Sequence, residues 1–433
     1  MNTNKWNPKY IATGAAFLAL TWILFLYIEK NLFSNTLLHI AIWSFAHVTF
    51  FTERIRFKQF VGLEILFSVF LCVVYFTGLL DVLIMPIIGF ALLASILYTP
   101  LISTFMSIAL VLYGTFIFGL GAHEIIAYLV ATTFTPVTVT LIKQRLNFII
   151  SGLISGAIMF FIVISKDFQH IEFRHFYALL NGLVSPIITL GIMPIMESVF
   201  SVITPMRLME ISNTSKPLLK RLMLEAPGTY HHSILVGHLA ETAAADIGAD
   251  YLLARAGAYY HDIGKLNAPV NYFENLGGRE NPHDTMTPIE SANCLRDHVR
   301  IGVEILKKNH FPSAVVDIVQ SHHGDSVMQY FYHKEKRNNV EADIENFRYQ
   351  GPKPVTKEES IIMFADCVEA AVRANGNVSV EETIEKIFAQ KIDEGQMTDS
   401  ELSFKEMAII KQSFKDVLSA SGHERIKYPG DVK

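Results

Sequence analysis

The chain is divided into an apolar half and a polar half, and this division limits the folds that it can adopt. Residues 1–205 carry ten Lys/Arg and eight Asp/Glu, whereas the remaining 228 residues carry 26 and 33. Each half is long enough to form a complete domain. A helix needs about 20 apolar residues to cross a bilayer core. We therefore expect a polytopic membrane domain at 1–205, followed by a polar domain outside the bilayer.

The apolar half contains up to eight runs that fit transmembrane helices. The second run is short and contains His39 and His47, and very little chain separates the runs on either side of Asp81 and of Pro100. Seven spans are therefore nearly as well supported as eight. The predicted spans are approximately 10–28, 36–52, 60–80, 82–98, 101–120, 123–142, 146–165 and 176–203.

Basic connections between the spans predict their orientation. Short loops rich in Lys and Arg remain on the cytoplasmic side of a membrane. The connections at 53–58 and 143–145 are basic, and counting onward from the second places the polar half in the cytoplasm. We predict a transmembrane domain at 1–205, a helical linker at 206–230 and a cytoplasmic domain at 231–433.

The polar half has the apolar periodicity of helices. This spacing predicts helices at 254–260, 290–308, 313–322, 357–375, 379–394 and 403–420. The stretch 333–356 is rich in charge, Pro and Gly, and is predicted to be a long surface loop. The expected fold is all-α: a transmembrane helical bundle followed by an all-helical cytoplasmic domain.

Charge and cysteine content exclude some functions. The net charge is −5 and no long basic run is present, which argues against binding of long nucleic acids. Cys72, Cys294 and Cys367 are far apart and match no CxxC pattern, so no disulfide framework is implied. The lipid bilayer is the partner that the composition itself indicates.

The pentapeptide His261-Asp262-Ile263-Gly264-Lys265 is the centre of a widely spaced series of metal-ligand residues. The series is His231-His232, His261-Asp262, His298, His322-His323 and Asp366. A single histidine in an apolar helix is more often structural than a ligand. The ordered set as a whole predicts a metal centre of imidazole and carboxylate ligands, as in hydrolytic di-metal sites.

Six motifs are similar to those of the seven-transmembrane HD-domain phosphodiesterases, whose PgpH-type members are cyclic di-AMP phosphodiesterases. The motifs are APGTYHHS (226–233), GAYYHDIGK (257–265), NPHD (281–284), HHG (322–324), FRYQGPKP (347–354) and ADCVEAAVR (365–373). The resemblance implies a hydrolase of the bacterial cell membrane with an HD-type catalytic domain in the cytoplasm. It would cleave cyclic di-AMP to linear pApA and so regulate a second messenger.

The resemblance also implies the roles of individual residues. Asp262 would bridge two divalent ions, manganese or iron, and would be catalytic. One shell would be completed by His232, His261 and Asp366, and the other by His298, His322 and His323. Lys265 would contact the scissile phosphate, the alternative being a solvated surface lysine. Arg373 would meet a phosphate or pair with Glu369.

Several alternatives remain open at this point. Cyclic di-GMP and guanosine tetraphosphate are rival substrates, although no GYP signature follows the HD motif. A nucleotide-binding membrane receptor without turnover is the rival from another class, and a homodimer is left open. Family members commonly carry a large extracellular domain after the first span. Here the first connection is only about 29–35, so that module is absent or the sequence is a truncated form.

Overall fold

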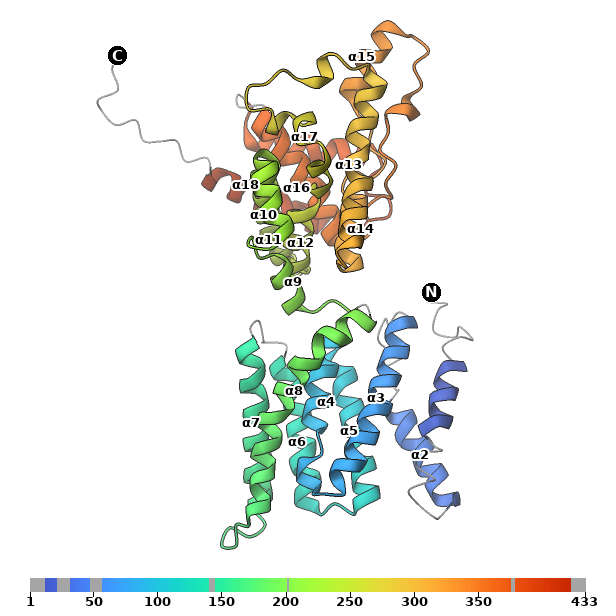
Figure 1. Cartoon of the computed structure of the whole chain (residues 1–433), viewed down its shortest axis with the longest axis vertical. Helices are drawn as coiled ribbons and strands as arrows, with labels where there is room; N and C mark the ends of the chain where they lie inside the picture. The colour runs from blue at the N-terminus through green and yellow to red at the C-terminus, as the bar shows by residue number, and fades with distance from the viewer. Residues whose placement is uncertain are drawn as a thin grey trace, which may run out of the picture. The chain divides into compact units, whose positions relative to one another are not determined.

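The computed structural model describes residues 12–21, 32–46, 57–139, 145–200, 202–374 and 378–421. The chain forms two compact units, Met1–Met206 and Arg207–Lys433. Both are helical (Figure 1), and the described residues contain no strand, only an isolated bridge between Val327 and Arg348. The expected all-α fold class is confirmed.

The helices of the first unit follow the predicted spans in order. They are Ala12–Thr21, α2 (Leu32–Ala46), α3 (Phe57–Gly78), α4 (Ile87–Leu97), α5 (Pro100–Phe118), α6 (Ala122–Val139), α7 (Arg145–Ile164) and α8 (Tyr177–Phe200), with single turns η3 (Val82–Ile84) and η4 (Phe173–Phe176). Among the described residues, four segments are long and apolar enough to cross a membrane: Gln59–Gly78, Pro100–Phe118, Leu146–Ile164 and Phe173–Glu197. Seven or eight spans stay a prediction. So does the orientation, because the basic connections at 53–58 and 143–145 lie mostly outside the described residues.

Helices α7 and α8 approach each other closely at glycines. A Cβ atom added at Gly156 would lie 2.7 Å from the Cα of Gly182, and one added at Gly152 would lie 2.6 Å from the Gly182 carbonyl oxygen. These glycines permit backbone-to-backbone packing, which helix pairs in membranes use in the absence of a hydrophobic driving force.

The first unit also buries a histidine. The Nδ1 of His39 on α2 lies 2.6 Å from the hydroxyl of Tyr113 on α5. Its Nε2 lies 3.3 Å from the Thr21 hydroxyl and 3.2 Å from the Leu18 carbonyl oxygen, both on the first helix. Both ring nitrogens of His39 therefore have protein partners, and the network ties three helices together.

The second unit is built around α11 (Pro227–Asp246), which packs against α12 (Tyr251–Tyr260), α16 (Lys357–Ala374) and α18 (Phe404–Ser421). Buried Ala, Leu, Ile and Phe side chains on these helices and on α17 (Val380–Asp393) form its main core. The remaining helices are α9 (Pro205–Ile211), α10 (Pro217–Glu225), α13 (Pro288–Lys308), α14 (Ser313–Ser321) and α15 (Gln329–Asn338).

The predicted surface loop at 333–356 is wrong over part of its length. Helix α15 continues to Asn338, and a short turn, η9 (Ile344–Phe347), follows. Phe347 is buried and packs with Met328, Phe331 and Ala292 in a second small core. The apolar area of this aromatic residue outweighs the polar composition around it.

Candidate metal centre

Five segments of the second unit bring the predicted ligand residues together. His232 lies on α11, His298 on α13 and Asp366 on α16. The pair His261-Asp262 follows the last turn of α12, and the pair His322-His323 follows the last turn of α14. The seven predicted ligand residues thus converge from positions up to 134 residues apart, because the α11 core holds these helix ends in one place.

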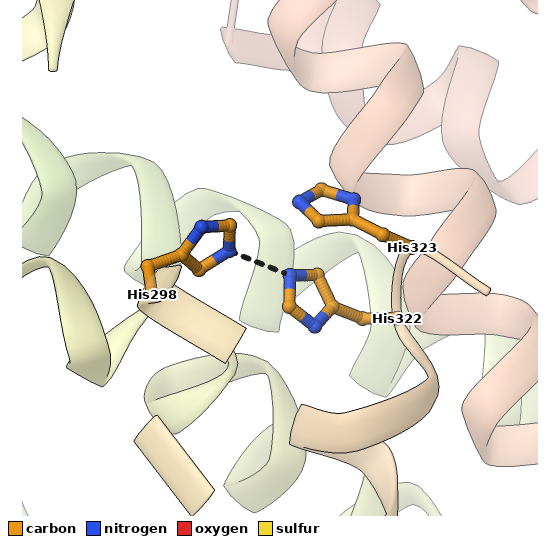
Figure 2. A group of neighbouring side chains, drawn as sticks. All are labelled: His298, His322 and His323. Carbon is orange, nitrogen blue, oxygen red and sulfur yellow. Dashed lines mark hydrogen bonds between the residues drawn. The ribbon is translucent and has the colours of Figure 1, made fainter. Parts of the chain in front are cut away.

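Two triads of ligand atoms are present. His232, His261 and Asp262 form one, and His298, His322 and His323 form the other. Within each triad one ligand atom from every residue lies within 4.8 Å of the others. In the second triad, shown in Figure 2, the rings of His298 and His322 point toward each other with their Nε2 atoms 3.3 Å apart, and His323 lies beside them.

Asp262, a member of the first triad, also faces the second. Its Oδ2 is 3.3 Å from the Nε2 of His261 and 3.7 Å from that of His232. Its Oδ1 is 3.3 Å from the Nε2 of His298 and 4.0 Å from that of His322. One carboxylate therefore faces both sets of imidazoles, which is the geometry required of a bridging ligand.

Asp366 also faces both sides. Its Oδ1 is 3.0 Å from the Nε2 of His232 and 3.7 Å from that of His261, while its Oδ2 is 3.6 Å from the Nδ1 of His323. Its position beside His232 and His261 agrees with the shell suggested for it, and it additionally approaches the second triad.

The histidines are held in one tautomer by their outer nitrogens. The Nδ1 of His261 donates to the Ala258 carbonyl oxygen at 2.7 Å, and that of His322 donates to the Val319 carbonyl oxygen at 2.8 Å. His298 makes the same bond to the carbonyl oxygen three residues before it. In a neutral ring this leaves Nε2 with a lone pair directed into the centre, as metal ligation requires.

The residues fit a bound cation. The Nε2 of His261 and the Oδ1 of Asp262 are buried and have no hydrogen-bond partner. An unpartnered buried polar atom costs about 1–3 kcal/mol, and a cation between the triads would satisfy both atoms. Imidazole and carboxylate ligands suit divalent transition metals.

The charge balance supports the same interpretation. Burial alone would lower the pKa of His261, but the nearby carboxylates of Asp262 and Asp366 have the larger combined effect and raise it to about 10. Burial and the neighbouring His261 and His298 lower the pKa of His322 to about 3. The carboxylates thus draw protons onto one triad while the other stays neutral, and a cation would supply the positive charge instead of those protons.

Glu369, one turn after Asp366 on α16, completes the site and was not predicted as part of it. Its Oε2 accepts a hydrogen bond from the Nδ1 of His232, and its Oε1 lies 3.5 Å from the guanidinium of Arg373. Of the two roles considered for Arg373, the ion pair with Glu369 is present. The spacing of Asp366 and Glu369 on one helix face is the signal that would have found this residue.

Lys265 is enclosed in the site and is not a solvated surface residue. Its Nζ lies 2.7 Å from the Oδ2 of Asp262, 2.8 Å from the Oε1 of Glu274 and 5.0 Å from the ring centroid of Tyr272. Burial lowers the pKa of Lys265, but the two carboxylates raise it above its usual value. Tyr272 and Glu274 were not predicted to belong to the site.

Two further features shape the centre. The ring of Tyr349 lies 4.2 Å from that of His323, centroid to centroid. Part of the segment 333–356 therefore packs against this predicted metal-ligand residue. A Cβ atom at Gly264 would lie 1.9 Å from the carbonyl oxygen of His298 and 2.7 Å from the backbone nitrogen of Gly302. Glycine at this position therefore permits direct contact between η5 (Ile263–Asn267) and α13.

The chain is similar to known proteins along most of its length. Residues 9–204 match the model of the 7TM receptor with intracellular HD hydrolase, and residues 229–371 match the HD domain model. The cyclic-di-AMP phosphodiesterase PgpH of Listeria monocytogenes is 42% identical over 258 residues, which cover 59% of this chain and 36% of that protein. PgpH of Bacillus subtilis is 41% identical over 256 residues, which cover 58% and 36%.

A solved structure is also similar. It is the crystal structure of the L. monocytogenes PgpH HD domain in complex with cyclic-di-AMP, with 42% identity, a TM-score of 0.47 and coverage of 48% of this chain and 99% of that one. The present chain spans about a third of the length of the curated relatives it matches. The two family models are thus matched in succession, the 7TM receptor with intracellular HD hydrolase along the first unit and the HD domain within the second.

Proposed function

We propose that this protein is a membrane-anchored phosphodiesterase that uses two divalent ions to hydrolyse cyclic di-AMP to linear pApA. The observation that carries the proposal is the convergence of two ligand triads on the single carboxylate of Asp262. The substrate comes from the relatives, which are cyclic-di-AMP phosphodiesterases by name.

The distances support the two shells that the resemblance implies. His232, His261 and Asp366 would hold one ion, His298, His322 and His323 would hold the other, and Asp262 would bridge them. Manganese and iron both suit these ligands. When bound, such a pair of ions supplies an activated water and stabilises charge on the phosphate oxygens.

The chain's own residues orient the reaction. Asp262 would be shared by the two ions, and Lys265, whose Nζ lies 2.7 Å from the Oδ2 of Asp262, would bind an oxygen of the scissile phosphate. Arg373 is a weaker candidate for substrate binding, because its guanidinium already pairs with Glu369.

The same proposal includes the location of the protein. The first unit would be a multi-pass domain of the bacterial cytoplasmic membrane at 1–205, joined by the linker 206–230 to a catalytic domain in the cytoplasm at 231–433. The four long apolar helices support membrane insertion. The family description, with its intracellular HD hydrolase, supports the orientation.

The test is turnover by the full chain purified in detergent and loaded with Mn²⁺ or Fe²⁺. Cyclic di-AMP, cyclic di-GMP and guanosine tetraphosphate are incubated separately, and the products are separated by chromatography. We expect pApA from cyclic di-AMP at the highest rate. Faster turnover of another nucleotide would reassign the substrate, and binding without product would favour a receptor.

A further inference from the structure

Glu274 contacts the candidate catalytic lysine from outside the predicted ligand set. Its Oε1 lies 2.8 Å from the Nζ of Lys265, and their side chains are only 13% and 14% exposed. The second carboxylate at this ammonium is Asp262, whose Oδ2 lies 2.7 Å from it. A charge pair this enclosed is weakly screened by solvent, so its geometry is well defined.

Glu274 is itself fixed to the first turn of α11. The Thr229 hydroxyl donates to the Oε1 of Glu274 at 3.0 Å. The adjacent Asn275 accepts from the Thr229 backbone N–H at 3.1 Å and donates to its hydroxyl at 2.9 Å. A Cβ atom at Gly228 would lie 1.9 Å from the Glu274 carbonyl oxygen, so the two backbones are in direct contact.

The proposal follows from the competing demands on Asp262 and rests on the function proposed above. The Oδ2 that Lys265 contacts also faces His261, at 3.3 Å, and is needed for a cation in that triad. With that oxygen engaged, Glu274 remains the carboxylate partner of the lysine. We propose that Glu274 is a positioning residue that holds the Lys265 ammonium ready for the scissile phosphate.

The surroundings of Lys265 restrict where its free N–H groups point. An ammonium has three N–H donors. Glu274 takes one, and the face of the Tyr272 ring covers another side with its centroid 5.0 Å from Nζ. On a third side lies the Oδ2 of Asp262, 2.7 Å from Nζ, and the phosphate of a substrate would be bound on that side.

The decisive experiment is a double-mutant cycle in the full chain in detergent, loaded with Mn²⁺ and supplied with cyclic di-AMP. Glu274→Gln is expected to lower kcat by about tenfold to a hundredfold, because small misplacement of a catalytic group has effects of this size. KM and the number of manganese ions per chain should stay unchanged. In a Lys265→Met background Glu274→Gln should have no further effect, since it acts through that lysine.

Graded variants separate positioning from folding. Glu274→Asp should recover part of the lost kcat, and Thr229→Val should reduce kcat less than Glu274→Gln does. Glu304→Gln removes a surface carboxylate that pairs with Arg300 on α13 and is the matched control. Wild-type kcat in Glu274→Gln, additive losses in the double variant, or loss of manganese from Glu274→Gln would each overturn the proposal.

A measurement that does not depend on hydrolysis separates failure of the proposed function from failure of the proposed role of Glu274. If the wild-type chain fails to cleave cyclic di-AMP, the proposed function fails. The contact is then tested by acetylating surface amines and measuring modification of Lys265 by mass spectrometry. Release of the ammonium should make labelling faster in Glu274→Gln than in wild type, and equal rates would overturn the positioning role.

Discussion

Buried histidines in the two units use their ring nitrogens in opposite ways. In the first unit His39 has partners at both nitrogens, the Tyr113 hydroxyl at one and Thr21 and Leu18 at the other. In the second unit His261 is bonded through Nδ1, while its Nε2 has no hydrogen-bond partner. Burial of a histidine therefore does not identify a functional site. A fixed outer nitrogen and an unpartnered inner nitrogen fit the predicted metal centre at His261 because other imidazole and carboxylate groups converge on the same place.

The largest expected effect comes from removing the charge shared by the two triads. Asp262→Asn keeps the side-chain volume but should lose both ions and lower cyclic di-AMP hydrolysis by about a thousandfold or more. Elemental analysis of metal per chain and a hydrolysis assay measure the two losses. Asp284→Asn, at the exposed aspartate of the NPHD motif (281–284), is the control. An Asp262→Asn chain that retains two ions would contradict the bridging role.

The next effect concerns the outer nitrogen of His232. Glu369→Gln weakens the bond that orients this ring and should reduce metal affinity by about 10- to 100-fold, as changes behind a metal ligand commonly do. Competition with a chelator measures the affinity. Glu385→Gln, which removes a surface partner of Lys411, should leave affinity unchanged. Unaltered affinity in Glu369→Gln would show that the backbone alone holds the ring.

The pH dependence of metal binding tests the charge balance of the second unit. The neighbouring carboxylates raise the pKa of His232, and they raise that of His261 to about 10 in spite of its burial, so a proton that occupies His261 at neutral pH must leave when a cation binds. Metal affinity should therefore rise with pH, by about tenfold per pH unit for each proton displaced. Chelator competition at pH 6, 7 and 8 measures this slope. A slope of zero would mean that the rings are already neutral.

The smallest effect is predicted for the histidine network of the first unit. Tyr113→Phe removes the hydroxyl beside the Nδ1 of His39 and should cost about 1–3 kcal/mol of stability. The expected result is a lower thermal unfolding midpoint in detergent, with metal content and hydrolysis unchanged. Tyr75→Phe, at a ring stacked on Phe118, is the control. Loss of metal in Tyr113→Phe would break the distinction between the two kinds of buried histidine.

The helices were largely predictable, because apolar periodicity and the lengths of apolar runs are local properties. The burial of Phe347 within the segment 333–356 was not predictable. It depends on contacts with Met328 and Ala292 and not on the polar residues next to it in the sequence. Tertiary contacts outweigh local composition there, as they commonly do.

The predicted ligand residues were identifiable from an ordered series of His and Asp, and the structure brings them together. The residues that contact these predicted ligands were harder to identify from the sequence. Glu369 was considered only as a partner of Arg373. Its bond to His232 could not be predicted because the two residues are 137 positions apart in the sequence. Glu274 lies in none of the quoted motifs, and Tyr349 lies in FRYQGPKP (347–354), a motif that gave it no individual role. Their proximity to Lys265 and His323 is a product of the fold.

Gly264 lies where two segments that carry predicted ligand residues meet. The main chain after Asp262 lies directly on the main chain of α13 at His298, with no room for even a methyl group between them. The backbone contact at Gly264 thus brings the segment that carries Asp262 close to the segment that carries His298. A side chain at residue 264 would force these two segments, and with them the predicted ligand residues, further apart.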